Sequence, residues 1–351
     1  MPPRAPLPAA PAPRARVNVP PPAPDPVAER DVKFTTSGSA MLNLVLSGTV
    51  EGGWAQGRCV NLVGDKSSGK TLLLIEECIN FARLYGVDSC RYVEAESAFD
   101  TDYARSLGMP DGLSLEAGIR TVEEFEQDLV DFLSKRKPGD GPCLYAVDSL
   151  DALSDTAELA RKADAGSYGA AKAKQLSEMF RKRISLVEQK QCTLFIISQI
   201  RDKIGVTFGE TKQRSGGHAL DFYASQVVWL AEKAKLKRTV LGAERTIGMQ
   251  VQARTKKNKV APPFRDADLT IFFGYGVDDE LSMLDWIKKH NCEHLMALSE
   301  KETRAAVLAS RAAGDRASLR ELHDDIKSAV EQRWLRMEEM LKPPMSKYGE
   351  V

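Results

Sequence analysis

Short apolar runs alternate with longer amphipathic segments over most of the chain from residue 34 onward. Continuous apolar runs are typical of strands that are buried on both faces of a sheet. The strands predicted in this way are 57–64, 89–95, 143–149 and 192–200. The intervening helices, predicted from helical spacing of apolar residues, are 70–86, 121–137 and 173–191. This alternation predicts an α/β fold with a mainly parallel central sheet that helices cover on both faces.

The predicted helix at 121–137 has a clear amphipathic pattern. Val122, Phe125, Leu129 and Leu133 recur at helical spacing, so they share one face of the helix. We expect that face to pack against the sheet.

The pattern changes after residue 225. Apolar and polar residues are then spaced as in antiparallel strands, which predicts that further strands extend the sheet. From about residue 278 the chain is charged and has helical spacing, and we interpret the charges as a solvated face. We therefore expect a core over 33–277 and a small, mostly helical C-terminal region over 278–351.

The N-terminal segment differs from the rest of the chain. Eleven of the 18 prolines lie within the first 30 residues. A segment of this composition buries too little apolar surface to offset the entropy lost on ordering. We expect residues 1–32 to form a disordered tail rich in proline and alanine.

Composition narrows the possible classes of protein. Hydrophobic residues make up 43% of the chain and charged residues 28%, as in an ordinary globular protein. Lys and Arg (49) balance Asp and Glu (49), which argues against a uniformly basic nucleic-acid-binding surface but allows a local basic patch. No apolar run is long enough to span a bilayer, so we expect no membrane partner.

The 6 cysteines include no C-x-x-C pair. We interpret them as small buried hydrophobic residues in a reducing compartment, which predicts a cytoplasmic protein. His290, Cys292 and His294 form a local metal-like cluster. They lack a fourth ligand at zinc spacing, so we do not expect a metal site there.

A phosphate-binding motif follows the first predicted strand. GDKSSGKT matches the pattern G-x-x-x-x-G-K-[ST] and precedes a predicted helix, which is the context that the motif requires. Backbone N–H groups of such a loop and of the helix N-terminus cradle nucleotide phosphates. We expect Lys70 to reach the β- and γ-phosphates and Thr71 to hold Mg²⁺. The predicted phosphate-binding residues are Gly64, Asp65, Lys66, Ser67, Ser68, Gly69, Lys70 and Thr71.

Acidic residues follow two other predicted strands. Asp148 ends the apolar run CLYAVD, so it is the expected partner of Thr71 at Mg²⁺. Glu94, Glu96 and Asp100 follow the strand at 89–95, and each could be a general base for hydrolysis or a solvated or capping residue. Periodicity does not choose among them. There is no N-K-x-D guanine-reading motif, so ATP with Mg²⁺ is the expected cofactor.

A long basic segment, RDKIGVTFGETKQRSGG at 201–217, comes directly after the predicted strand CTLFIISQI. It is too rich in glycine for a helix and too long for an ordinary connection. Its composition fits either an exposed loop without a role or a loop that closes on an anionic ligand.

Five separated motifs resemble those of the bacterial RecA recombinases, in the same order and with similar spacing. They are GDKSSGKT, YVEAESAFDTDYARSLG, YAVDSLDAL, SQIRDKIGVTFGETKQRSGGHALDFYAS and KKNKVAPPF. The resemblance covers roughly residues 35–275. It implies a RecA-like P-loop ATPase core that forms helical filaments on single-stranded DNA and catalyses pairing and strand exchange with homologous duplex DNA.

The resemblance also implies roles for residues around the nucleotide. Glu96 matches the glutamate that activates water, and Gln199 matches the sensor of the γ-phosphate. Asp100 and Tyr103 match residues that hold adenine. Two further matches, implied to reach ATP from the neighbouring subunit, are Lys257 and Lys259.

DNA-binding residues follow from the same resemblance and from their chemistry. Cations neutralise phosphates, and glycines let backbone N–H groups approach the strand; Ile204 is implied to wedge between base steps. The segment at 161–170 matches the first DNA loop. The predicted DNA-binding residues are Lys174, Arg181, Arg201, Lys203, Ile204, Lys212, Arg214, Ser215, Gly216 and Gly217.

The sequence departs from the family pattern at some positions. Asp221 and Val227 stand where the family usually has basic residues at the subunit interface, and the C-terminal region matches weakly. Two alternatives therefore stay open: an accessory ATPase without strand exchange, and a ring-forming DNA helicase or motor on the same fold.

Overall fold

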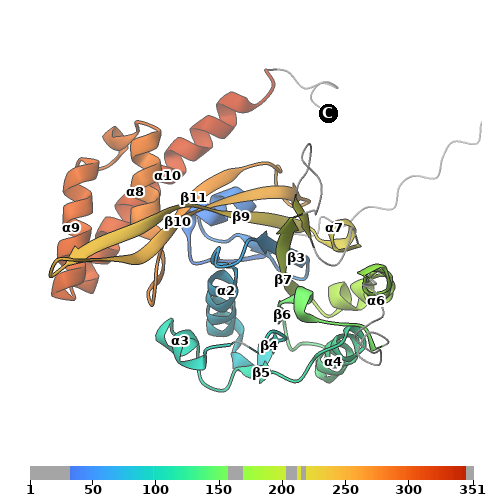
Figure 1. Ribbon diagram of the computed structural model, residues 1–351. Helices are drawn as coiled ribbons and strands as arrows, with labels where there is room; N and C mark the ends of the chain where they lie inside the picture. The colour runs from blue at the N-terminus through green and yellow to red at the C-terminus, as the bar shows by residue number, and fades with distance from the viewer. Residues whose placement is uncertain (1–31, 98, 157–168, 203–211, 215–218, 345–351) are drawn as a thin grey trace, which may run out of the picture. The chain divides into compact units, whose positions relative to one another are not determined.

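The computed structural model describes residues 32–97, 99–156, 169–202, 212–214 and 219–344, and Figure 1 shows their arrangement. The side chains of 169, 170, 201, 202, 212–214 and 219 are outside the description. In this part of the chain, no helix combines the length and the apolar character that crossing a membrane requires.

A ten-stranded sheet organises the fold. The strand order is β12-β11-β10-β9-β3-β7-β6-β4-β5, with β8 paired to β7. Pairing is parallel from β9 to β5 and antiparallel among β9, β10, β11 and β12. The strands are β3 (Cys59–Gly64), β4 (Cys90–Glu94), β5 (Ser114–Glu116), β6 (Cys143–Asp148), β7 (Cys192–Asp202), β8 (Lys212–Arg214), β9 (Gln226–Val240), β10 (Ala243–Asn258), β11 (Asp266–Phe272) and β12 (Gly276–Asp278). The predicted α/β fold, with a parallel sheet extended by antiparallel strands, is confirmed.

Successive residues of the strands face two separate layers of the core. Leu144 and Ala146 of β6 belong to one hydrophobic cluster, and Tyr145 and Val147 belong to the other. This alternation is the two-residue period of a strand buried on both faces. Helices lie on both sides of the sheet (Figure 1) and supply the other half of each cluster. Those that precede β9 in the described part of the chain are α1 (Ala40–Leu46), α2 (Lys70–Tyr85), α3 (Thr101–Ser106), α4 (Val122–Lys135), α6 (Gly169–Gln189) and α7 (Ala219–Tyr223).

The amphipathic helix predicted over 121–137 is α4. Its buried residues are Val122, Phe125, Leu129 and Leu133, the four that the sequence pattern placed on one face. The helix begins with a reciprocal capping box between Thr121 and Glu124, which satisfies two N–H groups at its start.

Residues 34–55 precede the main sheet in the chain and contain a short strand pair and helix α1. Strand β1 (Phe34–Thr35) pairs antiparallel with β2 (Trp54–Ala55). Asn43 of α1 donates through Nδ2 to the carbonyl oxygen of Val50 at 2.9 Å. These bonds tie residues 34–55 to the parallel part of the sheet, where Gln226 accepts from the N–H of Ala55 at 2.9 Å.

Cysteines occupy apolar positions in the fold. Cys59, Cys78, Cys90, Cys143, Cys192 and Cys292 are all buried free thiols. Their interpretation as small buried hydrophobic residues is confirmed.

Three C-terminal helices pack against the sheet: α8 (Asp279–Lys289), α9 (Glu300–Ala313) and α10 (Arg316–Leu341). Their buried residues, including Trp286 and Trp334, belong to the same hydrophobic cluster as the sheet. The Arg265 guanidinium lies 5.4 Å from the ring of Trp334 and forms an ion pair with Glu338. The C-terminal helices therefore share the core of the sheet.

A buried carboxylate lies where α2 meets β12. The Val277 N–H donates to Glu76 Oε1 at 2.9 Å, whereas Glu76 Oε2 is buried without a hydrogen-bond partner. Burial raises the pKa of Glu76 to about 7, and the neighbouring Asp279 adds to the shift while the Val277 N–H opposes it. Protonation of Glu76 is therefore easier in the folded than in the unfolded chain.

We expect Glu76→Gln to flatten the pH dependence of stability. Because the folded pKa is raised, the folded state binds more protons between the unfolded pKa and pH 7, so the free energy of unfolding falls as pH rises through this window. The loss attributable to Glu76 is on the order of 2–3 kcal/mol between pH 5 and pH 8. Chemical denaturation of both proteins at these two pH values measures it.

The exposed Glu339 of α10 supplies a matched control, since Glu339→Gln leaves the pH dependence as in the unsubstituted chain. Asp279, whose pKa burial raises to about 6, contributes in the same direction in all three proteins. The informative quantity is therefore the difference between the curves. Parallel curves for Glu76→Gln and the unsubstituted chain would contradict the prediction.

Candidate active site

The phosphate loop begins at the last residue of β3 and ends at the first turn of α2. Gly64 allows close packing, because a Cβ atom there would clash with Ser68 Oγ and lie 3.0 Å from the carbonyl oxygen of Leu230. Gly69, the N-cap of α2, has φ +89° and makes no side-chain cap. The backbone conformation and the uncapped helix start suit a loop whose N–H groups face an anion.

Lys70 lies folded over this loop. Its Nζ donates to the carbonyl oxygen of Asp65 at 2.7 Å. Burial lowers the pKa of Lys70, and the carboxylates of Asp148 and Glu96 oppose that shift. A buried ammonium group beside several carboxylates is well placed to exchange its backbone partner for phosphate oxygens.

Asp148 ends β6 beside the start of α2. Its Oδ2 accepts hydrogen bonds from Thr71 Oγ1 at 2.7 Å and from the Tyr92 hydroxyl at 2.8 Å. Burial raises the pKa of Asp148, and these two donors oppose the shift. A hydroxyl and a carboxylate oxygen at one point form the hard oxygen donor set that Mg²⁺ prefers, so these residues fit the ion.

Glu96, two residues after the end of β4, and Gln199 of β7 come together. The Gln199 Nε2 donates to Glu96 Oε1 at 2.7 Å, and Ser149 Oγ donates to the same oxygen. The Gln199 N–H donates to Asp151 Oδ2 at 2.6 Å. One Glu96 oxygen is thus held by two side chains while Gln199 is fixed through its backbone.

The other two carboxylates that the sequence left open have different surroundings. Glu94 is the last residue of β4, is buried, and pairs in register with Asp148. Asp100 is the N-cap of α3, where its side chain accepts from the Tyr103 N–H at 2.9 Å. Glu94, Glu96, Asp100, Asp148, Thr71 and Tyr103 nevertheless all line one small cavity of about 140 Å³.

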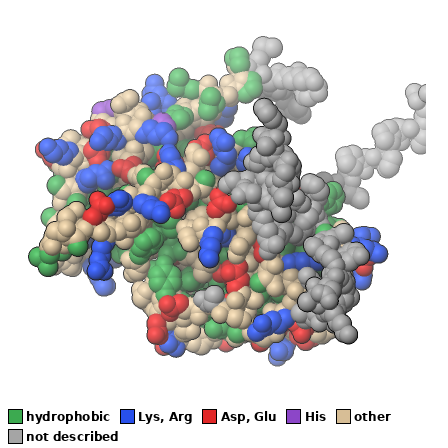
Figure 2. Space-filling model, in the orientation of Figure 1, with side chains coloured by type: hydrophobic (Ala, Val, Ile, Leu, Met, Phe, Trp, Pro, Cys, Tyr) green, Lys and Arg blue, Asp and Glu red, His purple; other side chains and the backbone are tan. Residues whose placement is uncertain are grey.

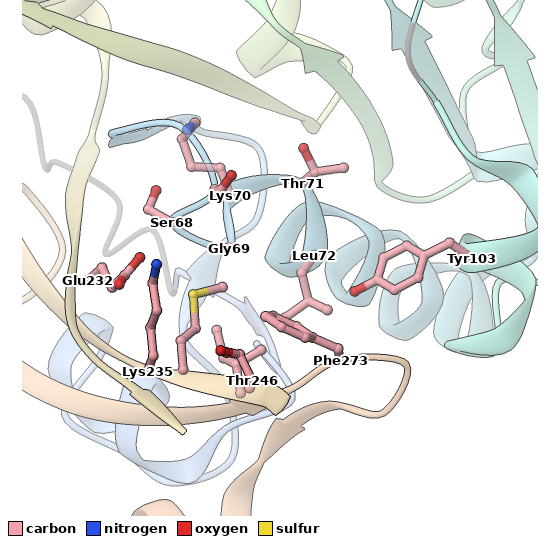
Figure 3. A pocket seen from close by; sticks show the side chains of 14 residues that line it. Ser68, Gly69, Lys70, Thr71, Leu72, Tyr103, Glu232, Lys235, Thr246 and Phe273 are labelled. Carbon is pink, nitrogen blue, oxygen red and sulfur yellow. The ribbon is translucent and has the colours of Figure 1, made fainter. Parts of the chain in front are cut away.

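A larger cavity of about 590 Å³ adjoins the phosphate loop on the side of α2 and β9. Tyr103 projects toward it from α3 and Phe273 from the turn after β11, with Leu72 between them (Figure 3). A cavity beside a phosphate loop that two aromatic rings help to line suits a nucleobase. Its lining residues are Ser67, Ser68, Gly69, Lys70, Thr71, Leu72, Tyr103, Glu232, Lys235, Thr246, Gly248, Met249, Ile271 and Phe273.

Sequence reasoning missed Phe273, Glu232 and Lys235 in this cavity. Phe273 is 56% exposed, and the run FFGYG that contains it could have been noticed as an aromatic turn after a strand. Nothing in the local sequence distinguishes Lys235 from the other lysines of β9. Its position depends on how β9 pairs.

Lys257 and Lys259 lie away from this loop, near the opposite end of β3. Lys257 Nζ donates to the carbonyl oxygens of Asp221 at 2.5 Å and Phe222 at 3.0 Å. Burial raises the pKa of Cys59, the first residue of β3, to about 12, and the charges of both lysines oppose this shift. The fold therefore does not bring these two lysines to the phosphate loop of their own chain.

The departures noted in the sequence have different environments. Val227 is 1% exposed and belongs to the hydrophobic core. Asp221 lies on α7 and is half-buried. Val227 is thus a core residue rather than a surface residue.

The predicted DNA-binding residues fall partly outside the described residues. Strand β7 continues past Gln199 to Asp202 and pairs there with β8, with Ile200 opposite Arg214 and Asp202 opposite Lys212. Lys174 and Arg181 of α6 are exposed and seven residues apart, so they share a helix face. The segment at 161–168 and the residues Lys203, Ile204, Ser215, Gly216 and Gly217 lie outside the described residues, as do the side chains of Arg201, Lys212 and Arg214.

Comparison with known proteins gives a consistent assignment. The RecA N-terminal domain family matches residues 25–278. Protein RecA of Sulfurimonas denitrificans is 34% identical over 256 residues, covering 73% of this chain and 70% of the relative. Protein RecA of Borrelia duttonii is 33% identical over 259 residues, covering 73% and 67%. Protein RecA 2 of Myxococcus xanthus is 32% identical over 262 residues, covering 75% and 69%.

The family match spans the segments that contain the phosphate loop, Glu96, Asp148 and Gln199. It ends at Asp278, where the C-terminal helices begin. With both the family description and relatives above 30% identity in agreement, the chain belongs to the RecA family of DNA recombinases.

Proposed function

We propose that this RecA-family chain binds ATP with Mg²⁺, assembles as a filament on single-stranded DNA, hydrolyses ATP and pairs the bound strand with homologous duplex DNA. The observation that carries the proposal is the hydrogen bond from Gln199 Nε2 to Glu96 Oε1. It joins a carboxylate beside the phosphate loop to the strand that enters the basic segment at 201–217.

Nucleotide binding uses the loop Gly64–Thr71 for the phosphates and the larger cavity for the base. The N–H groups at the start of α2 and the ammonium of Lys70 face the phosphates. Thr71 and Asp148 hold Mg²⁺, which neutralises phosphate charge when bound. Tyr103 and Phe273 stack on adenine, with Asp100 holding the start of the Tyr103 helix.

Hydrolysis uses Glu96 as the general base. Its carboxylate accepts a proton from the attacking water, while Ser149 and Gln199 keep it oriented through their hydrogen bonds to Oε1. The remaining oxygen, Oε2, is then the proton acceptor. Gln199 responds to the γ-phosphate because it is hydrogen-bonded to Glu96, the residue that activates the attacking water.

DNA binding uses two surfaces. Arg201, Lys203, Lys212 and Arg214 neutralise phosphates of the single strand, and Ser215, Gly216 and Gly217 allow close backbone approach. Ile204 inserts between bases. Lys174 and Arg181 add charge from the exposed face of α6.

Strand β7 transmits the effect of the bound nucleotide from Gln199 to the DNA-binding segment at 201–217. Gln199 is followed at once by Ile200, whose backbone pairs with β8. A change in the bond between Gln199 and Glu96 therefore acts on the base of the basic segment. This is a two-state switch that the γ-phosphate biases.

We expect Glu96→Gln to abolish turnover and preserve binding. The amide keeps an oxygen that can accept from Ser149 and Gln199 but cannot take a proton, and loss of a general base lowers kcat by roughly 10²–10⁴-fold. ATPase rates with and without single-stranded DNA, nucleotide and DNA affinities, and electron microscopy of the DNA complex measure the effects. Glu123→Gln on α4, remote from the loop, serves as the matched control.

The same measurements test the function as a whole. Hydrolysis stimulated by single-stranded DNA, with helical filaments in the micrographs, is the expected result for the unsubstituted chain. Rings that unwind duplex DNA would instead indicate a motor. Binding without turnover would indicate an accessory role, and unchanged turnover in Glu96→Gln would remove Glu96 from the mechanism.

We expect mixed subunits to reveal a composite active site. Lys257 and Lys259 act on the ATP of the neighbouring subunit, so a Lys257→Ala/Lys259→Ala chain and a Glu96→Gln chain are each inactive alone. In an equal mixture, about a quarter of head-to-tail interfaces combine an intact Glu96 with intact lysines. DNA-stimulated ATPase activity of the mixture then recovers to about a quarter of the activity of the unsubstituted chain.

The control is each variant alone, at the same total protein concentration as the mixture. No recovery in the heterologous mixture would contradict action between subunits. Sedimentation of the mixed filaments verifies that the two chains assemble together.

We expect Lys212→Ala/Arg214→Ala to weaken binding to single-stranded DNA similarly for all sequences. Each lost phosphate contact reduces the slope of log affinity against log salt by about 0.7 for a single strand. Fluorescence anisotropy with two unrelated oligonucleotides at several salt concentrations measures both effects. Lys135→Ala/Arg136→Ala, at the end of α4, is the charge-matched control, and an unaltered slope in the Lys212/Arg214 variant would refute the assignment.

A further inference from the structure

The β9–β10 ribbon runs past the phosphate loop. Strand β3 pairs with β9 from Gln226 to Leu230, and its last residue, Gly64, lies opposite Leu230. The pairing of β9 with β10 continues beyond this point as far as Val240 and Ala243. Residues 231–240 therefore extend beyond the end of β3, at the level where the phosphate loop starts, and stay paired with β10. Figure 1 shows the long ribbon that β9 and β10 form.

A β-bulge in this ribbon turns two charged residues to the same side. Glu232 pairs with Val251 and Ala234 pairs with Gln250, so Lys233 is an extra residue between consecutive pairs. Residues three apart in a regular strand face opposite sides. Glu232 and Lys235 nevertheless both line the cavity beside the phosphate loop, because a bulge shifts the alternation by one residue.

Lys235 differs from its neighbours in its ion pairing. Lys233 pairs with Asp268 at 2.9 Å, and Lys237 pairs with Glu244 at 2.8 Å. Within the described part of the chain, Lys235 forms no ion pair and no hydrogen bond through its side chain. Figure 3 shows its ammonium group pointing toward Ser68, with the Glu232 carboxylate on the same side.

We propose that Lys235 binds the polyphosphate of the nucleotide, from the side of the cavity opposite Lys70 and within the same chain. This inference rests on the proposed function, because it requires a nucleoside polyphosphate in the loop. A lysine is a compact charge on a flexible stem, so Lys235 can reach a phosphate by a change of its side-chain rotamer, without a change in the backbone.

The negative charge of Glu232 lies in the same part of the cavity lining as Lys235. It attracts the Lys235 ammonium and repels phosphate charge. Removing Lys235 and removing Glu232 should therefore change the affinity for a polyphosphate in opposite directions. Neither change should alter the affinity for adenosine, which has no phosphate.

The experiment measures dissociation constants of ATP, ADP and adenosine by calorimetry, with Mg²⁺ and without DNA. The protein concentration is chosen so that sedimentation shows single subunits, which removes any contribution from a neighbour. Lys235→Met should raise the Kd of ATP roughly tenfold and that of ADP less, since a charge-assisted contact is lost. Lys237→Met, whose lysine pairs with Glu244 on the same strand, should leave all three values unchanged.

Glu232→Gln tests the opposite effect. Because it removes a negative charge that repels phosphate, it should lower the Kd of ATP by a few-fold. Unchanged adenosine binding in every variant verifies that the cavity is intact. The inference is overturned if Lys235→Met leaves the Kd of ATP unchanged, or if it raises the Kd of adenosine as much as that of ATP. Failure of the unsubstituted chain to bind ATP would overturn the proposed function itself, which is a separate result.

Discussion

The position of β3 between β7 and β9 is the constraint on which the rest of the structure depends. Gly64, the last residue of β3, lies opposite Gln199 on one side and Leu230 on the other. Parallel pairing brings the carboxyl ends of these strands to one edge of the sheet, where ligands of such sheets bind. The phosphate loop thus starts between a strand that leads to the basic segment and a strand that leads to the ribbon. Residues proposed to contact the nucleotide lie on both sides of the loop because of this one register.

Burial of charged groups gives the same edge its chemical character. Lys70, Asp148 and Glu94 are each less than a tenth exposed, yet they gather within a small part of the fold. Such groups are stable only when they are close to opposite charge or hydrogen-bond donors. Thr71 and Tyr92 supply donors to Asp148, and Asp65 supplies an acceptor to Lys70. The arrangement keeps charges ready for a ligand in surroundings where water screens them weakly.

Much of the fold and part of the site could be predicted from the sequence because they depend on local patterns. The continuous apolar run of β6 and the four apolar residues of α4 identify their elements without knowledge of any partner. The phosphate loop is also local, since its glycines, lysine and threonine are adjacent in the chain. By contrast, residues 231–240 of β9 are charged and mostly exposed, so no burial pattern predicts the length of that strand. Hydrogen-bonded pairing with β10 keeps these residues in a strand instead.

The sequence by itself determined an α/β sheet, a phosphate loop that ends in Lys70 and Thr71, and an acidic residue, Asp148, at the end of a strand. Tertiary structure decided which distant residues meet this loop. It brought Gln199 to Glu96, placed Phe273 and Lys235 in the cavity, and put Lys257 and Lys259 near the other end of β3. The physical reason is that strand order, register and a single bulge set these distances. They depend on pairing between segments far apart in the chain, which local periodicity does not encode.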